Sequence, residues 1–217
     1  MSKIAAIRQK IPREVFDYQI LLGTLAGYSK PRDKITRLLA GGEIVRIKKG
    51  LYCFGEAFRR APISREYLAN LIHGPSYVSL ESALSFHALI PERVEVMTSV
   101  TTRRSREFAT PFGNFSYRTL SERRYAVGGI LQAAGKTPFL IASPEKALAD
   151  KVWTDKRFSG QRVSDYAAYL SDDLRIDLDA LGALDDARLR AIGLAYASRK
   201  IDNLLRYLKR LEDSRDA

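Results

Sequence analysis

The chain has 217 residues, of which 46% are hydrophobic and 28% are charged, and its formal net charge at pH 7 is +11. This composition is typical of a globular protein and excludes a disordered chain, while the length allows one large domain or two small ones. The excess of positive charge favours a polyanionic partner, with nucleic acid ahead of an anionic membrane surface.

The first 40 residues predict three helices. A short helix is expected near 4–9, and a second over 12–28 (PREVFDYQILLGTLAGY), because Pro12 suits a first turn and the apolar residues form a stripe. A third helix is expected after Ser29, which is a favourable N-cap, with Pro31 in its first turn and Gly41-Gly42 at its end.

Residues 43–54 (EIVRIKKGLYCF) predict a hairpin of two short strands. Ile44, Arg46 and Lys48 alternate with Val45 and Ile47, and Lys49-Gly50 forms the turn. Helix, turn, helix and hairpin follow one another in the order of a winged helix-turn-helix. We therefore expect residues 1–57 to form a DNA-binding domain of this type.

Residues 58–217 predict a second domain of mixed α+β structure with a helical C-terminus, joined through a linker at 55–62. Ser79 and Ser143 are expected N-caps, and Pro144 suits a first helical position. The expected helices cover 64–74, 79–89, 143–153 and 198–213, and the expected strands lie within 93–102, 113–120 and 137–143. The fold class expected for the whole chain is α+β.

The positive charge is concentrated near the N-terminus. Residues 1–60 contain 13 Lys and Arg against 5 Asp and Glu, whereas residues 61–217 contain 23 against 20. The third helix would pack Ile35, Leu38 and Leu39 on its own domain and present long donor side chains to the major groove. The candidate DNA-binding residues are Ser29, Lys30, Arg32, Lys34, Thr36 and Arg37 on the helix and Arg46, Lys48 and Lys49 on the hairpin.

A basic helix face is often only solvated, and winged helices also bind proteins. The coincidence of helix, hairpin and local charge favours DNA. Two further basic segments, 101–107 (TTRRSRE) and 121–125 (SERRY), could extend a DNA-binding track or contact a protein.

Catalytic signatures are absent from the sequence. It contains neither a P-loop nor a GxGxxG motif, and its two histidines and one cysteine lack zinc-ligand spacing. We expect no catalytic residue, metal or cofactor. Glu81, Glu145, Asp150 and Lys151 could converge on a polar pocket, but helix capping and surface ion pairs are the favoured interpretation.

The sequence also bears on the compartment. Cys53 is the only cysteine, so no intrachain disulfide forms, which fits a reducing compartment. The first 16 residues lack the apolar stretch of a signal peptide, and no apolar run approaches the roughly 20 residues of a membrane helix. We expect a cytoplasmic protein that does not associate with membranes.

Three segments resemble the AbiEi-type antitoxins. Residues 21–55 (LLGTLAGYSKPRDKITRLLAGGEIVRIKKGLYCFG) resemble the N-terminal winged-helix domain of that family. Residues 76–92 (SYVSLESALSFHALIPE) and 138–152 (PFLIASPEKALADKV) resemble segments of its C-terminal domain. The resemblance implies a two-domain antitoxin of a type IV toxin–antitoxin pair, encoded beside a nucleotidyltransferase toxin.

Such an antitoxin represses its own operon through the N-terminal domain and requires the C-terminal domain to neutralise the toxin. The resemblance places the DNA contacts at 30–40 and 44–54, and the antitoxin segments around 79–87 and 143–151. The implied partners are double-stranded operator DNA, bound by a monomer or weak dimer, and the cognate toxin. Two alternatives stay open: a stand-alone winged-helix regulator, and an antitoxin that modifies its toxin enzymatically.

Overall fold

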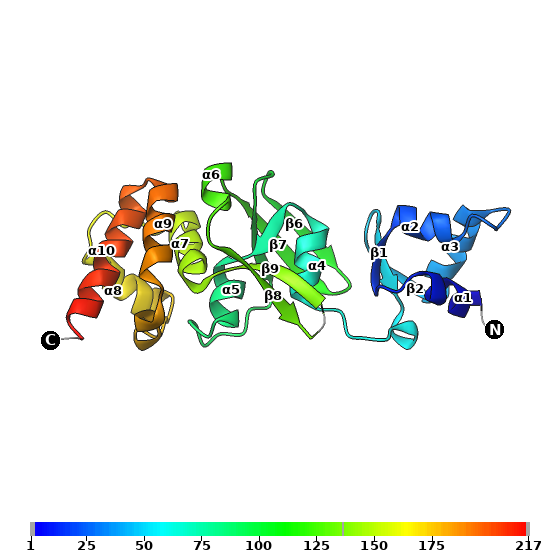
Figure 1. Ribbon diagram of the computed structural model, residues 1–217, viewed down its shortest axis with the longest axis horizontal. Helices are drawn as coiled ribbons and strands as arrows, with labels where there is room; N and C mark the ends of the chain where they lie inside the picture. Colours follow the sequence, from blue (N-terminus) through cyan, green and yellow to red (C-terminus); the bar gives the residue numbers. More distant parts are fainter. Residues whose placement is uncertain (1–2, 136, 216–217) are drawn as a thin grey trace. The chain divides into compact units, whose positions relative to one another are not determined.

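The computed structural model describes residues 3–135 and 137–215, which form a mixed α+β structure with helices and two sheets (Figure 1). The chain divides into two compact units. The smaller unit comprises the residues up to Arg65 together with Thr110–Phe112, and the larger unit comprises Glu66–Ala109 and the residues from Gly113 onward.

The smaller unit alternates helices and strands. Its elements are α1 (Lys3–Lys10), β1 (Val15–Asp17), α2 (Tyr18–Thr24), α3 (Pro31–Ala40), β2 (Ile44–Lys48), β3 (Leu51–Phe54) and the 3-10 helix η1 (Glu56–Phe58). The strands described in this unit form an antiparallel sheet in the order β1-β3-β2. The helix expected near 4–9 is confirmed as α1, and the expected hairpin is confirmed as β2–β3.

The single helix expected over 12–28 is wrong. Its first part is strand β1, in which Val15 and Phe16 are buried, and Phe16 packs on Phe54 of β3 with ring centroids 4.8 Å apart. Pairing with β3 therefore decides the conformation of a segment whose apolar residues also suit a helix. Asp17 then caps α2, since its carboxylate accepts a hydrogen bond from the Ile20 N–H at 2.8 Å.

The core of the smaller unit draws on all three helices and the sheet. Its buried side chains are Ile4, Ile7, Ile11, Phe16, Leu21, Leu25, Ile35, Leu38, Ile44, Tyr52 and Phe54. Cys53 is also fully buried on β3, as expected of a small core residue. The helix α3 and the hairpin β2–β3 are thus attached to one common core.

The larger unit contains a mixed sheet. Its strands are β4 (Ser76–Val78), β5 (Met97–Thr101), β6 (Arg106–Thr110), β7 (Gly113–Thr119), β8 (Gly129–Ala134) and β9 (Thr137–Ala142), in the order β6-β7-β5-β4-β9-β8. Strand β5 pairs in parallel with β7 and antiparallel with β4, while β9 is parallel to β4 and antiparallel to β8. The short strands β4, β6 and β8 were not predicted.

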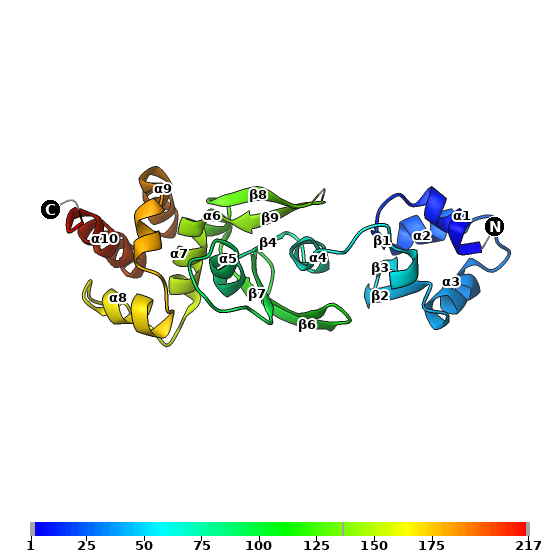
Figure 2. The same cartoon turned by 90° about the horizontal axis from the view of Figure 1, so that it is seen from below.

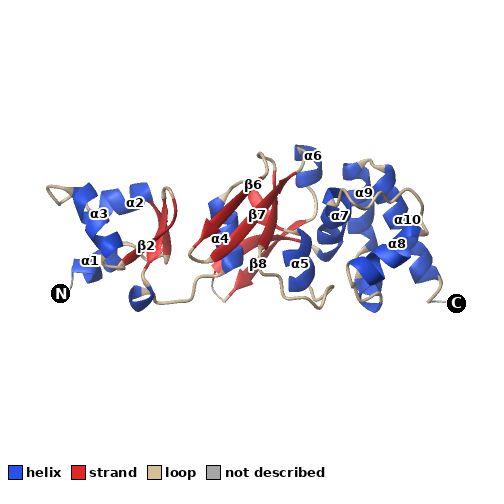
Figure 3. Ribbon diagram, turned by 180° about the vertical axis from the view of Figure 1, so that it is seen from behind, coloured by secondary structure: helices blue, strands red, loops and turns tan. Residues whose placement is uncertain are grey.

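Helices cover this sheet and extend beyond it. They are α4 (Arg65–Ile72), α5 (Leu80–Phe86), α6 (Glu122–Tyr125), α7 (Pro144–Thr154), α8 (Asp165–Ala168), the π-helical turn η2 (Tyr169–Asp173), the 3-10 helix η3 (Asp179–Ala183), α9 (Asp186–Tyr196) and α10 (Arg199–Asp213). Helices α7 to α10 gather at one end of the sheet (Figure 3). In the described part of the chain, no helix is long and apolar enough to cross a membrane.

Helices α5 and α7 begin at the N-cap residues that the sequence predicted. Ser143 caps α7 by accepting the Lys146 N–H at 3.3 Å, and Pro144 occupies the first helical position, as predicted. Ser79 is the N-cap of α5, also as predicted, but its hydroxyl makes no capping bond and donates to Asp150 instead. In α10 the expected apolar stripe is confirmed, because Ile201, Leu204 and Leu208 are buried.

Candidate functional site

Helix α3 separates apolar from basic side chains. Ile35 and Leu38 are buried in the core, whereas Arg32, Thr36 and Arg37 are exposed and Lys34 is half-buried. This spacing follows from the helical repeat, since residues three and four apart share one face. The Thr36 hydroxyl donates its hydrogen to the Arg32 carbonyl at 3.2 Å. This hydroxyl can therefore only accept a hydrogen bond from a further partner.

The start of α3 lies one residue later than predicted. The N-cap is Lys30 rather than Ser29, and no side chain makes a capping bond there. Both residues are exposed, and Pro31 holds the first turn as expected. Uncapped N–H groups and the positive end of the helix dipole favour an anion at this end. A shallow hollow of about 460 Å³ lies beside it, lined by Leu22, Lys30, Pro31, Arg32 and Asp33.

The hairpin carries its cations at the turn. Arg46 and Lys49 are exposed and Lys48 is half-buried, while Gly50 completes the turn at φ +86°. The simple alternation expected along β2 is wrong, because the register shifts between Arg46 and Lys48. Ile47 is buried at this bulge, and Ile44 is buried at the start of the strand.

Helix α3 and the hairpin are held together at the segment between them. The Glu43 N–H donates to the Leu38 carbonyl at 3.0 Å, and the Gly55 N–H donates to the Glu43 carbonyl at 2.9 Å. A side chain at Gly55 would collide with the carbonyl of Gly42, so the end of β3 passes close to the end of α3. The basic residues of helix and hairpin therefore belong to one rigid body.

Most of the candidate cations lack acidic partners. Within residues 3–135 and 137–215, no ion pair involves Lys30, Arg32, Lys34, Arg37, Arg46 or Lys49. Arg8 differs, because its guanidinium is buried, is paired with Glu14 and donates to the Ile11 carbonyl at 2.6 Å. Burial lowers the pKa of Arg8, although the Glu14 charge opposes the shift. Arg8 thus supports the core, while Lys30, Arg32, Arg37, Arg46 and Lys49 remain open to an external anion.

Both arginines of the segment 121–125 make contacts within the larger unit. Arg123 donates to the Leu194 carbonyl at 2.6 Å. Arg124 donates to the Tyr196 carbonyl at 3.0 Å and lies 3.9 Å from the centre of the Trp153 ring. These bonds attach α6 to the C-terminal end of α9, but a carbonyl acceptor leaves the positive charge of each arginine in place, and Arg123 stays exposed.

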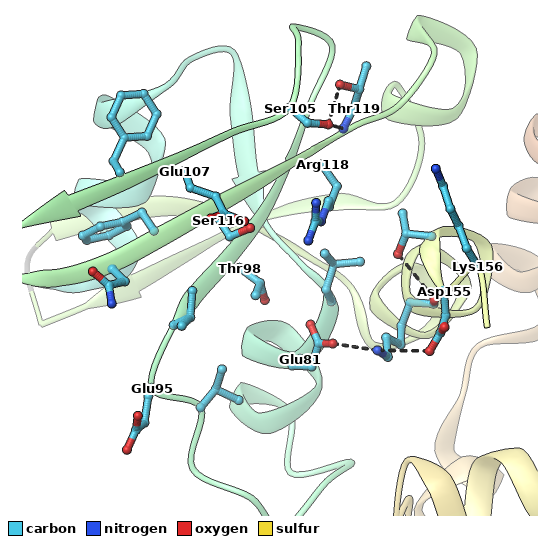
Figure 4. Close-up of a pocket in the computed structure, with 18 of the residues that line it drawn as sticks. Glu81, Glu95, Thr98, Ser105, Glu107, Ser116, Arg118, Thr119, Asp155 and Lys156 are labelled. Atoms are coloured by element: carbon cyan, nitrogen blue, oxygen red, sulfur yellow. Dashed lines mark hydrogen bonds and ion pairs between the residues drawn. The ribbon is translucent and has the colours of Figure 1, made fainter. Parts of the chain in front are cut away.

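A groove of about 1310 Å³ opens in the larger unit (Figure 4). Strand β7 contributes Arg118, which points into the groove, and helices α5 and α7 contribute Glu81 and Lys151. Lys151 bridges Glu81 at 2.7 Å and Asp155 at 3.5 Å. Two of the four residues considered as a polar pocket, Glu81 and Lys151, therefore meet here as a partly exposed ion pair.

Asp155 is a largely buried carboxylate of this groove. Its side chain is only 6% exposed, and Arg157 lies 3.4 Å from it. Burial alone would raise the pKa of Asp155, but the hydrogen bonds from Arg157 and the charge of Lys151 lower it to about 2.

Asp155→Asn is expected to lower the free energy of unfolding of the larger unit by about 1–2 kcal/mol at pH 7. The folded-state pKa is below the unfolded value of about 3.9, so the carboxylate stabilises the fold above that pH and loses its effect as pH falls toward about 2. Denaturant titrations followed by the fluorescence of Trp153 would measure the difference, with Asp213→Asn on the exposed end of α10 as control. A difference that is absent at pH 7, or does not shrink in acid, would contradict this role.

The other two residues considered for a polar pocket, Asp150 and Glu145, lie inside the protein. Asp150 of α7 is fully buried, accepts a hydrogen bond from Ser79 at 2.6 Å and is bonded to Lys146 and Tyr196, which are also fully buried. Burial lowers the pKa of Lys146, and burial together with the Asp150 charge raises the pKa of Tyr196. This cluster, the buried Lys146 network, joins α5, α7 and α9.

Glu145 is likewise buried and structural. It accepts a hydrogen bond from the Ser143 hydroxyl at 2.6 Å and another from the Asp185 N–H at 2.8 Å. Glu145 therefore bonds to the N-cap residues of α7 and α9 and is not itself a cap, and a surface ion pair is wrong for Asp150. Sequence reasoning missed Lys146 and Tyr196, because a Lys–Asp pair four residues apart has the spacing of an exposed helical pair.

No clustering of His, Cys, Asp and Glu suited to a metal ion occurs in the part of the chain that the structure describes. Comparison of the sequence with protein-family models and with curated proteins found no match. The resemblance to the AbiEi-type antitoxins therefore remains a prediction that rests on the three quoted segments.

Proposed function

We propose that the smaller unit is a winged helix-turn-helix that binds double-stranded DNA. The order α1, β1, α2, α3, β2, β3 with a β1-β3-β2 sheet supports this proposal. In it, α3 enters the major groove and the β2–β3 hairpin is the wing that contacts the phosphate backbone.

One observation carries the proposal: cations without acidic partners gather on one rigid body. Lys30, Arg32 and Arg37 on α3 are exposed, as are Arg46 and Lys49 on the hairpin. Desolvating an unpaired cation against a protein surface is unfavourable, whereas a phosphate supplies both opposite charge and hydrogen-bond acceptors. A duplex therefore matches these side chains better than an apolar protein surface does.

The wider role that we propose is that of a cytoplasmic antitoxin and transcriptional autorepressor of a type IV toxin–antitoxin operon. Its partners would be the operator DNA and a nucleotidyltransferase toxin. This part rests on the sequence resemblance, whose segments fall on α2 to β3, on β4 to α5 and on β9 to α7. A stand-alone regulator of the same fold is one alternative, and a nucleotidyltransferase reading frame beside the gene distinguishes it from the antitoxin. An antitoxin that modifies its toxin enzymatically is the other, and the mass of the toxin after incubation with the protein and ATP tests it.

The full chain is expected to bind the DNA upstream of its own gene in a mobility-shift assay, and Lys49→Ala is expected to weaken binding to all duplexes alike. An exposed wing lysine neutralises a phosphate, so its loss should reduce the slope of log K against log salt by about one. The exposed Lys209→Ala on α10 removes the same charge elsewhere and should leave the slope unchanged. A loss confined to one DNA sequence would contradict the backbone role of Lys49.

A further inference from the structure

Strand β8 is an uncovered edge of the larger sheet. It ends the strand order, and Figure 2 shows the β8–β9 hairpin on the side away from β6. Leu131 is 68% exposed, and its cross-strand partner Leu140 is 44% exposed. Gly129, Gln132 and Ala133 are exposed as well. No other element of the described chain therefore shields this strand.

The free backbone groups of β8 follow from its register with β9. The Ser143 N–H donates to the Gly128 carbonyl at 2.8 Å, and the pairing continues without a shift through Ile130 opposite Ile141. In an antiparallel ladder, alternate residues bond to the partner strand and those between them face outward. Ile130 is thus bonded to β9, whereas the N–H and C=O groups of Leu131 and Ala133 point to the open edge.

The two edges of this sheet differ in charge. The edge strand β6 begins with exposed Arg106 and Glu107, and charged side chains of this kind disfavour pairing with another strand. Strand β8 (GILQAA) contains no charged residue and no proline. In a chain of net charge +11, two copies repel each other over much of their surface, and β8 is a place where they can approach without like charges facing.

We propose that β8 pairs antiparallel with β8 of a second copy of this chain, about a two-fold axis at Leu131. Leu131 then faces Leu131 of the second copy, and Gly129 faces Ala133. The outward N–H and C=O groups of each copy become donors and acceptors for the other, and the two sheets join into one. The exposed Leu131 side chain gains apolar neighbours across the axis.

The pairing forms a weak homodimer. A single pair of short strands covers less area than a standard stable interface, so its dissociation constant is on the order of 10–100 µM. This inference does not depend on the DNA-binding proposal, because all of its residues belong to the larger unit.

Sedimentation velocity of the full chain over a concentration series tests the pairing. The wild type should shift from monomer to dimer, and Leu131→Lys should raise the dissociation constant at least about tenfold, because it places two cations face to face at the axis. Leu140→Lys is the matched control, since it removes a neighbouring exposed leucine that is not on the edge and should change the constant less than about threefold.

Amide hydrogen exchange supplies a second readout that does not depend on substitution. The Leu131 and Ala133 amides should become protected as the concentration rises, while the Ile130 amide is protected throughout. A wild type that stays monomeric at several hundred micromolar would overturn the proposal, as would a dimer that survives Leu131→Lys. Loss of the dimer in Leu140→Lys without protection of the Leu131 amide would also overturn it, in favour of packing through the apolar face.

Discussion

Asp150→Ala is expected to destabilise the larger unit by about 3–5 kcal/mol, the cost of leaving one member of a buried ion pair without its partner. The Asp150 carboxylate is the common acceptor for Ser79, Lys146 and Tyr196, and every one of these side chains is fully buried. Its removal leaves the Lys146 ammonium in an environment that already lowers its pKa through burial. The folded state then must either hold a charge without a counterion or release the proton.

Trp153 makes this experiment direct. It is the only tryptophan of the chain, and its ring lies 5.9 Å from that of Tyr196, beside the buried Lys146 network. Denaturation followed by its fluorescence therefore reports on this unit. The double variant Lys146→Met/Asp150→Leu removes both charges and should lose less stability than Asp150→Ala alone.

The exposed Asp213→Ala serves as the control for charge and should leave stability within about 0.5 kcal/mol of the wild type. If Asp150→Ala were as stable as this control, the buried network would not support the fold. Equal losses in Asp150→Ala and the double variant would show that the unpaired Lys146 charge is not the source of the cost.

Arg32→Ala/Arg37→Ala is expected to weaken binding of the full chain to its upstream DNA by at least about 100-fold at low salt, equivalent to about 3 kcal/mol. Both arginines are exposed on α3 without an acidic partner among the described residues, so no internal ion pair is lost with them. The fold of the smaller unit should persist, because Ile35 and Leu38 supply the buried face of the helix.

The matched control is Arg206→Ala/Arg210→Ala, which removes two exposed arginines from α10 and lowers the net charge equally. Its affinity should fall only slightly, through the long-range field. Equal losses in both variants would mean that net charge alone, and not α3, attracts the duplex.

The sequence predicted α3 and the hairpin well because their determinants are local. Pro31, the spacing of Ile35 and Leu38, and Gly50 at the turn act within a few residues of one another. Strand β1 was missed because it depends on β3, which follows more than 30 residues later, and because Val15 and Phe16 suit a helical stripe equally well. The bulge at Arg46 also depends on packing that no alternation pattern reveals.

The buried polar residues of α7 also depend on packing that the sequence does not reveal. Lys146 and Asp150 lie one helical turn apart, which is the spacing of a solvated ion pair. The packing of Tyr196 from α9 and of Ser79 at the start of α5 against them makes the pair a buried one. Burial is a property of the assembled unit, so the spacing in sequence could not distinguish these two cases.

The salt dependence of DNA binding tests the central claim most directly. Fluorescence anisotropy would titrate one labelled duplex with the wild type, with Arg32→Ala/Arg37→Ala and with the α10 control at several salt concentrations. We expect a steep negative slope of log K against log salt for the wild type and the control, and a slope smaller by about two for the α3 variant. A wild type without measurable affinity, or three identical slopes, would contradict a duplex held by the cations of α3.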